Sequence, residues 1–192
     1  MANRDSVVSS DSEELILVDR DDNEVGHLSK AQCHDGDGIL HRAFSVFLFN
    51  DKGELLLQQR AGSKRLWPLF WSNSCCSHPR RGESMGEATV RRVQQELGIE
   101  VTVEFVYKFS YQARFAELGS EHELCWVFLG RSSEKAQPNS NEIAALRYMD
   151  TAALSAELAA NSDVFTPWFK LEWQRLQEEF GARLDEYASP VK

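Results

Sequence analysis

The chain has little of what would mark a membrane, secreted or nucleic-acid-binding protein. Among its 192 residues, no apolar run approaches the roughly 20 residues that a membrane-spanning helix requires. The segment Met1–Glu14 is polar and acidic, and it lacks the basic-then-apolar order of a secretory signal. Basic residues are few: 21 Lys and Arg stand against 30 Asp and Glu, a net charge of −9, which disfavours binding to duplex nucleic acid. We therefore expect a cytoplasmic protein that binds neither nucleic acid nor a membrane.

Cysteine is also scarce, with four residues in the whole chain. In a reducing compartment Cys33, Cys75, Cys76 and Cys125 are expected to be thiols. The adjacent pair Cys75–Cys76 is poorly suited to a disulfide and lacks the spacing of a zinc knuckle. Apolar residues make up 42% of the chain, enough for a core without such cross-links.

Repeats, long linkers and signals of a second domain are likewise missing, so the sequence predicts a flexible N-terminal tail over residues 1–13 and one domain over 14–192. Apolar alternation predicts strands at residues 14–19, 41–50, 54–60, 71–75, 103–113, 121–130 and 143–148, with a further short strand after the turn at 21–24. Helices are expected at 30–33, 84–97, 151–160 and 167–184. This order predicts an α/β (α+β) fold with a mixed sheet between helices.

The clearest helix is the one predicted over 84–97. Gly86, Val90, Val93 and Leu97 fall at spacings that line one face, and Gly98 is positioned to end the helix. Its charged residues also fit i,i+4 ion pairs on a solvated face, a purely structural interpretation.

The segment around this helix, WSNSCCSHPRRGESMGEATVRRVQQELGI, resembles a Nudix box, the loop–helix–loop of hydrolases that act on nucleoside-diphosphate-linked substrates. Six residues stand where that pattern expects them: Glu83, Arg91, Val93, Glu96, Gly98 and Ile99. Ser77 replaces the leading glycine, and Arg92 and Gln95 replace two glutamates. Nudix hydrolases use the glutamate row to hold divalent cations and activate water. The two losses argue against ordinary pyrophosphate hydrolysis.

The flanking motifs are similar to those of type I isopentenyl-diphosphate isomerases, which share the Nudix fold. The matching segments are Asn73–Pro79, the loop from Arg60 to Pro68, the residues Glu121–Glu123, the spaced His34 and His41, Tyr111, and Phe165–Trp168. Their occurrence together and in order, over about residues 16–180, is highly specific. The resemblance implies an enzyme of isoprenoid biosynthesis that interconverts isopentenyl and dimethylallyl diphosphate. We expect this small isoprenoid diphosphate as its partner, and a monomer or weak dimer.

Carboxylates and histidines indicate a metal site. Glu121 and Glu123 lie two apart in a predicted strand, so they share a face, whereas His122 points away. The resemblance places both carboxylates with His34, His41 and His78 on one metal. This mixed nitrogen and oxygen set suits a transition metal such as Mn²⁺ or Zn²⁺ better than Mg²⁺ or Ca²⁺.

The resemblance also implies a second cation and a diphosphate clamp. Glu96 and the backbone carbonyl of Cys76 would hold Mg²⁺ that bridges the substrate diphosphate. Basic residues are the expected contacts of the phosphate oxygens: Lys30, Arg60, Lys64 and Arg92, with Arg65 as a weaker candidate. Such a cluster reconciles an acidic protein with a polyanionic substrate.

Moving a double bond requires an acid and a base on either side of the substrate. Cys76 and Glu123 match the family's proton-transfer residues, and Tyr111 is placed to polarise the acid. The carbocation-like intermediate must be shielded from water, and the Trp168 ring can stabilise it by cation–π attraction of roughly 2 kcal/mol. Cys75 alternates with Cys76, so we assign it to packing, together with Cys33 and Cys125. Two other functions stay open: a Nudix pyrophosphohydrolase, and a metal-stabilised binding module without activity.

Overall fold

The centre of the sheet is strand β3 (His41–Phe49), whose apolar side chains are buried on both faces. The computed structural model describes residues 6–191. In it β3 pairs in parallel with β8 (Gly119–Arg131), and β8 pairs antiparallel with β7 (Val103–Phe115). This register sets His41 and Tyr111 opposite Glu123, one on each side. Residues far apart in the sequence thereby meet at one end of the sheet.

The remaining strands extend the sheet on both sides of β3. Strands β1 (Glu14–Val18) and β2 (Glu24–Ser29) pair at one edge. Strand β4 (Leu55–Arg60) follows on the other side with β5 (Trp71–Ser72) and β9 (Ile143–Met149). The short strand β6 (Cys75–Ser77) pairs antiparallel with β3 and sets Cys76 opposite Ser45.

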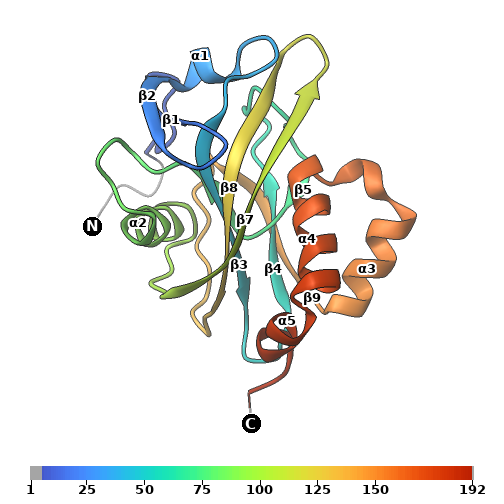
Figure 1. Cartoon of the computed structure of the whole chain (residues 1–192). Coiled ribbons are helices and arrows are strands. Elements are labelled where there is room, and N and C mark those ends of the chain that lie inside the picture. Colours follow the sequence, from blue (N-terminus) through green and yellow to red (C-terminus); the bar gives the residue numbers. More distant parts are fainter. Residues whose placement is uncertain (1–5, 192) are drawn as a thin grey trace.

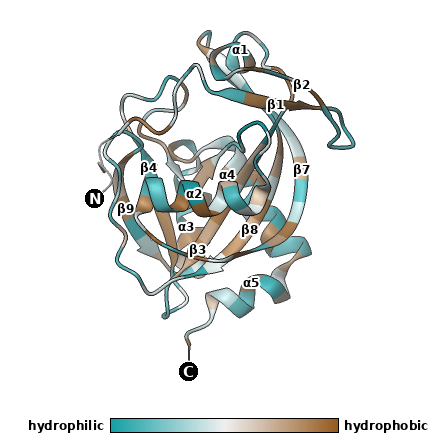
Figure 2. Cartoon of the chain, turned by 90° about the vertical axis from the view of Figure 1, so that its left-hand side faces the viewer, coloured by the Kyte–Doolittle hydropathy of each residue, from teal (hydrophilic) through white to brown (hydrophobic). Residues whose placement is uncertain are grey.

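Helices cover both faces of this sheet, as Figure 1 shows. Helix α2 (Met85–Leu97) packs on the face that carries Phe44 and Val46. Helix α4 (Pro167–Glu179) packs on the opposite face, against Phe47, and is joined by α3 (Thr151–Ala160), the short η1 (Ser162–Val164) and α5 (Gly181–Ala188). Figure 2 shows α2 in front of strands that are hydrophobic over much of their length. The predicted mixed sheet between helices is confirmed.

Three sequence predictions need correction. The strand predicted at 71–75 is two short strands, β5 and β6, because the buried Asn73 and Ser74 use their side chains to bond nearby backbone carbonyls. The single last helix is broken at Phe180 into α4 and α5. The predicted apolar face of α2 is only partly right, since Val93 and Leu97 are buried but Gly86 is exposed and Val90 is 47% exposed.

The inward face of α2 carries charge as well as apolar groups. Thr89, Arg92, Val93 and Glu96 are all buried, so the helix turns an ion pair toward the protein interior. Ser84 caps the helix in a capping box with Glu87, and Gly98 ends it with φ 67°. The end at Gly98 was predicted correctly, whereas the burial of Arg92 and Glu96 was not.

The expected N-terminal tail and the division at residue 13 stay predictions. Residues 1–5 lie outside the described part of the chain, whereas residues 6–13 run beside α1 (Lys30–His34) and contact it. None of the helices in the described residues is long and apolar enough to cross a membrane.

Candidate active site

A cavity of about 560 Å³ opens at the end of the sheet where β3 begins. It is lined by nearly all residues predicted for the site: Lys30, His34, Arg60, Lys64, Cys76, His78, Arg92, Glu96, Tyr111, Glu121, Glu123 and Trp168. The remaining one, His41, lies beneath the surface with no exposed area. With His41, these residues come from eight elements and from the loops after β4 and β6, and the fold brings them to one place.

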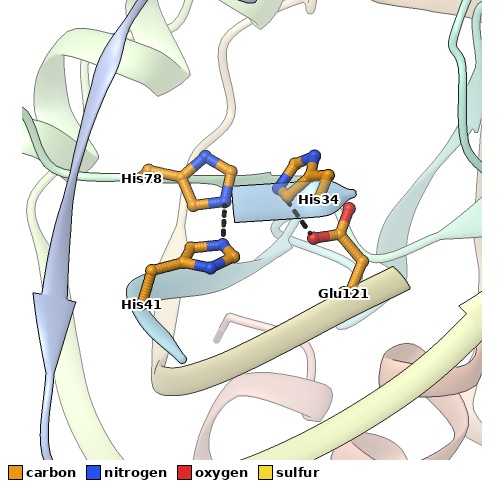
Figure 3. Close-up of side chains that lie close together, drawn as sticks. All are labelled: His34, His41, His78 and Glu121. Carbon is orange, nitrogen blue, oxygen red and sulfur yellow. Dashed lines mark hydrogen bonds and ion pairs between the residues drawn. The ribbon is translucent and has the colours of Figure 1, made fainter. Parts of the chain in front are cut away.

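Three histidines and a glutamate form a tight cluster in this cavity, as Figure 3 shows. The potential ligand atoms of His34, His41, His78 and Glu121 all lie within 4.8 Å of one another, and all four residues are buried. His34 Nε2 lies 3.0 Å from Glu121 Oε2, and the two Nε2 atoms of His41 and His78 lie 3.2 Å apart. Glu123 Oε1 lies 3.1 Å from His78 Nε2 and 3.7 Å from His41 Nε2.

The donors of this cluster fit a divalent cation. His34 Nε2 and Glu121 Oε2 are buried, and apart from their contact with each other they have no hydrogen-bond partner. His41 Nδ1 lies 2.7 Å from the Ile39 carbonyl, to which it donates, so its Nε2 is directed into the cluster. Burial lowers the pKa of His78 to about 4, so this imidazole is neutral, the form that binds metals. The cluster is compatible with a metal site.

Glu123 is the carboxylate with the most specific surroundings. Tyr111 donates a hydrogen bond to its Oε2 at 2.6 Å, while Oε1 faces two imidazoles. Burial acts to raise the pKa of Glu123, but the hydrogen bonds with His41 and His78 outweigh it and hold the pKa well below the usual value. Glu123 is therefore ionised at neutral pH and has an oxygen atom ready to receive a proton.

The adjacent thiols of β6 face opposite sides of the sheet. Cys76 lines the cavity, whereas Cys75 has no exposed area and packs with Phe44 and Val46 beneath α2. Burial raises the pKa of Cys76 to about 12, with the nearby carboxylates adding to the effect and Arg60 opposing it. At neutral pH Cys76 is thus a thiol that carries a proton into the cavity.

Basic residues form another part of the cavity lining. Lys30 donates to the Ser9 hydroxyl, and Lys64 forms an ion pair with Glu142. Arg60 donates to the carbonyls of Leu66 and Trp67, which fixes its guanidinium beside the Trp168 ring at 5.2 Å from the ring centroid. These contacts orient the side chains of Lys30, Lys64 and Arg60.

Arg92 and Glu96 form a buried ion pair on α2. Arg92 is 1% exposed and donates through Nε and Nη2 to Glu96 Oε1, while its Nη2 also lies 3.5 Å from Glu142. The solvated face expected for this pair is therefore absent. Arg91 does not pair with Glu87; it binds Glu83, whereas Glu87 caps the helix.

Trp168 lies at the apolar side of the cavity. It is 3% exposed, meets Trp67 edge-on at 5.3 Å and lies 6.2 Å from the Tyr111 ring. Its ring therefore shares the cavity with the side chain of Cys76 and the carboxylate of Glu123. This gives the site an aromatic wall, while the basic residues Lys30, Arg60, Lys64 and Arg92 form a cationic wall, and the two walls meet where Arg60 lies beside the Trp168 ring.

Three predicted exclusions agree with the geometry. His122 points away from the cavity, where its Nδ1 lies 3.4 Å from the Gly38 carbonyl. Cys33 is buried and its thiol faces the Leu28 carbonyl. Arg65 lines the cavity rim but forms an exposed ion pair with Asp35, so it remains the weaker candidate.

Sequence reasoning missed two buried acids and a backbone segment. Glu142 lines the cavity between Lys64 and Arg92, although nothing in its local sequence marks it. Glu172 lies on α4 behind the cavity, with its Oε1 3.4 Å from Cys125 Sγ. Residues 7 and 9–11 also line the cavity. A glutamate within an otherwise apolar helix face was the one available signal, at Glu172.

Comparisons with known proteins identify the family. Residues 39–169 match the NUDIX domain. An isopentenyl-diphosphate Delta-isomerase 1 of Photorhabdus laumondii is 44% identical over 163 residues, which is 84% of this chain and 93% of that protein. An isopentenyl-diphosphate Delta-isomerase of Serratia proteamaculans is 44% identical over 157 residues, covering 82% of this chain and 87% of that one.

Solved structures support the same fold. The protein DR0079 of Deinococcus radiodurans superposes with a TM-score of 0.69 at 24% identity, covering 85% of this chain and 98% of its own. A MutT protein of Methanosarcina mazei reaches a TM-score of 0.61 at 20% identity, covering 73% and 95%. With the cysteine, histidine and glutamate residues in one cavity, the chain belongs to the isopentenyl-diphosphate Delta-isomerase family of NUDIX-domain proteins.

Proposed function

We propose that this chain interconverts isopentenyl diphosphate and dimethylallyl diphosphate, with Cys76 and Glu123 as its proton-transfer residues. One observation carries the proposal: a thiol and a carboxylate of opposite protonation state line one cavity. The pKa of Cys76 is raised to about 12, and that of Glu123 is held well below its usual range. At neutral pH one residue has a proton to donate and the other can accept one.

The two residues divide the reaction between them. Cys76 Sγ donates its proton to the terminal alkene carbon, whose π electrons form the new C–H bond and leave a tertiary carbocation. Glu123 then removes a proton from the neighbouring carbon, and that C–H electron pair becomes the new double bond. Afterwards the thiolate regains a proton and the carboxylic acid loses one, so the enzyme returns to its starting state.

Tyr111 and Trp168 support this chemistry. The Tyr111 hydroxyl holds the Glu123 carboxylate in place through its 2.6 Å hydrogen bond to Oε2. The face of the Trp168 ring stabilises positive charge by roughly 2 kcal/mol when water is excluded. The enclosed aromatic wall also keeps water from attacking the carbocation.

The cationic wall binds the diphosphate. Four basic residues line the cavity from α1, β4, the loop after β4 and α2: Lys30, Arg60, Lys64 and Arg92. Arginine offers a planar pair of donors to phosphate oxygens, and lysine adds a point charge. Anchoring the charged end leaves the hydrocarbon end at Cys76 and Glu123.

Two divalent cations complete the proposal. His34, His41, His78, Glu121 and Glu123 would hold Mn²⁺ or Zn²⁺, and Glu96 with the Cys76 carbonyl would hold Mg²⁺. When bound, the first cation supplies positive charge that orients the carboxylates, and Mg²⁺ neutralises phosphate charge. His34 Nε2 and Glu121 Oε2, which have no hydrogen-bond partner beyond each other, support the assignment of the first cation.

One assay separates isomerisation from hydrolysis. The protein is incubated with isopentenyl diphosphate, Mn²⁺ and Mg²⁺; NMR follows the alkene, and colorimetry follows phosphate. We expect dimethylallyl diphosphate without phosphate release, because Arg92 and Gln95 occupy positions where a hydrolase needs carboxylates. Faster phosphate release than isomerisation would replace the proposal with a pyrophosphohydrolase. The expected monomer or weak dimer and the expected cytoplasmic location stay predictions.

A further inference from the structure

Glu142 is a buried carboxylate among the basic residues that bind the diphosphate in the proposed function. It is 5% exposed and lines the cavity. Its carboxylate forms an ion pair with Lys64, and its Oε2 lies 3.5 Å from Arg92 Nη2. One acid therefore contacts two of the four residues of the cationic wall, and the reaction steps proposed above give it no role.

The backbone around Glu142 is tied to the two elements that carry those cations. The Glu142 carbonyl accepts from the Ala61 amide at 2.9 Å, in the loop after β4 that also carries Lys64. The Asn139 amide donates to the Glu96 carbonyl at 2.8 Å, on α2, and the Asn139 carbonyl accepts from the Glu142 amide at 3.0 Å. The fold thus holds the Glu142 carboxylate in the cavity wall, between Lys64 and Arg92.

Arg92 lies between two carboxylates that are both ionised. Its Nη2 contacts Glu96 Oε1 and Glu142 Oε2. Burial acts to raise the pKa of Glu142, but the charges of Lys64 and Arg92 outweigh it and lower the pKa. A diphosphate that approaches Lys64 and Arg92 therefore meets two negative charges as well as two positive ones.

The whole cavity lining shows the same balance. Five Lys and Arg side chains line it, and five Asp and Glu side chains stand against them. The protein side chains alone thus offer a free polyanion little net attraction, because phosphate oxygens are repelled by the carboxylates next to each cation. Mg²⁺ reduces this repulsion, since it lowers the charge of the diphosphate and prefers oxygen ligands such as the Glu96 carboxylate.

We propose that Glu142 is a specificity-determining residue of the diphosphate site: its charge beside Lys64 and Arg92 disfavours metal-free diphosphate, so that tight binding depends on Mg²⁺. Specificity here is a difference between two affinities, and the repulsive group acts mainly against the more highly charged ligand. The inference rests on the assignment of Lys64 and Arg92 to the diphosphate in the proposed function.

Calorimetric titration with sodium pyrophosphate tests the proposal without relying on turnover. The protein keeps its transition metal, and each variant is titrated in Mg²⁺-free buffer and again with Mg²⁺. Glu142→Gln keeps the side-chain shape but removes the charge. It should tighten Mg²⁺-free binding at least about fivefold, the effect of one unit charge about 4 Å away even at the dielectric constant of water. Binding with Mg²⁺ should change less, so the ratio of the two affinities falls.

Three further variants separate charge from packing. Glu142→Ala removes the same charge and should lower the ratio in the same direction. Glu142→Asp keeps the charge, so its ratio should stay within about twofold of the wild-type value. Glu157→Gln is the matched control, because Glu157 pairs with Arg147 at 2.9 Å and does not line the cavity; its ratio should not change. A thermal melt of each variant checks folding.

Unchanged Mg²⁺-free binding in Glu142→Gln and Glu142→Ala would overturn the proposal. Weaker Mg²⁺-free binding would also overturn it, because Glu142 would then serve only to hold Lys64 and Arg92 in place. A ratio that falls equally in Glu142→Asp would assign the effect to shape instead of charge. If the wild type isomerises its substrate but the ratio never changes, this inference alone fails. If the ratio falls as expected but the wild type does not isomerise, the proposed function fails instead.

Discussion

Adjacent cysteines on β6 show how one residue step separates packing from chemistry. Cys75 and Cys76 both have pKa values raised by burial. Cys75 lies under α2 among Phe44, Val46 and other apolar groups, with no route to the cavity. Cys76 lies on the other face, opposite Ser45, and lines the cavity with Glu123. A raised pKa therefore indicates burial, and position distinguishes the proposed proton donor, Cys76, from the core residue Cys75.

The two faces of the sheet differ in the same way over a larger area. Toward α2, the buried residues under the helix form an apolar cluster. Toward α4, the face carries His41, Glu123 and Cys125, and α4 adds the buried Glu172. Polar groups on this face are tolerated because most of them are paired.

The strongest test of this comparison exchanges each thiol. Cys76→Ala should lower turnover by about 10²–10⁴-fold, because it removes the proton donor, with little loss of thermal stability. Cys75→Ala should keep most of the turnover but lose on the order of 1 kcal/mol of stability, because it leaves a small void under α2. Turnover and thermal melts are measured at equal folded concentration. Comparable losses of turnover in both variants would mean that the strand register is wrong.

Metal content tests the polar face next. Elemental analysis after gel filtration should find about one transition metal per chain, as expected for a mostly protein-liganded site. The His78→Ala/Glu121→Ala double variant should bind at least about 100-fold more weakly, more than loss of an outer partner alone. His122→Ala is the matched control, since its ring points away, and should keep the metal. Metal lost from the control, or kept by the double variant, would contradict the assignment.

Glu172 tests whether the polar groups behind the cavity reduce stability. Burial raises the pKa of Glu172 to about 8, with Glu123 adding to the effect, so between its usual pKa of 4.5 and pH 8 the folded protein holds a proton that the unfolded chain has released. Stability should therefore fall as the pH rises from 4.5 toward 8 and level off above that. Glu172→Gln should remove this fall and add on the order of 3 kcal/mol at pH 8, with little change at pH 4.

Denaturant titrations of Glu172→Gln across this pH range measure the effect. Glu178→Gln, on the exposed side of the same helix, serves as control and should leave the profile unchanged. An unaltered pH slope in Glu172→Gln would show that Glu172 is ionised in the folded protein.

The smallest effect concerns the cationic wall. Arg92→Lys keeps the charge but loses the planar fork that engages Glu96 and phosphate, so KM for isopentenyl diphosphate should rise about five- to tenfold with a smaller change in kcat. Arg91→Lys, next along α2 and paired with Glu83 away from the cavity, should leave KM within about twofold. Steady-state kinetics of both variants measure this. Equal KM values in the two variants would remove Arg92 from the clamp.

How far the sequence could predict this structure depends on how far apart in the chain the interacting residues lie. Strands, helix caps and the Nudix-like segment are local, and the sequence predicted them nearly to their ends. Motifs also predicted most of the site, because Cys76, His78 and Glu121 carry their own short signatures. The break at Asn73 was missed because its side chain bonds backbone that only the fold brings near.

The sequence could not predict contacts between residues that lie far apart in the chain, for a physical reason. Glu142 meets Lys64 across 78 residues, and Val8 meets Arg92 across 84, so no periodicity or spacing links them. The burial of Arg92 and Glu96 was missed because they look like a solvated i,i+4 pair, whereas Arg92 also contacts Glu142 and the Val8 carbonyl, which are distant in sequence.

Isomerisation in D₂O tests the central claim most directly, that Cys76 delivers a proton and Glu123 removes another. Thiol protons exchange with solvent between turnovers, so the proton donated to the terminal carbon becomes deuterium. NMR of the dimethylallyl diphosphate formed by the wild type should therefore show deuterium in the newly formed methyl group, and Cys76→Ala should form almost none of this product. Product formed at the wild-type rate with no deuterium in that methyl group would indicate a direct shift of hydrogen within the substrate and would contradict the account.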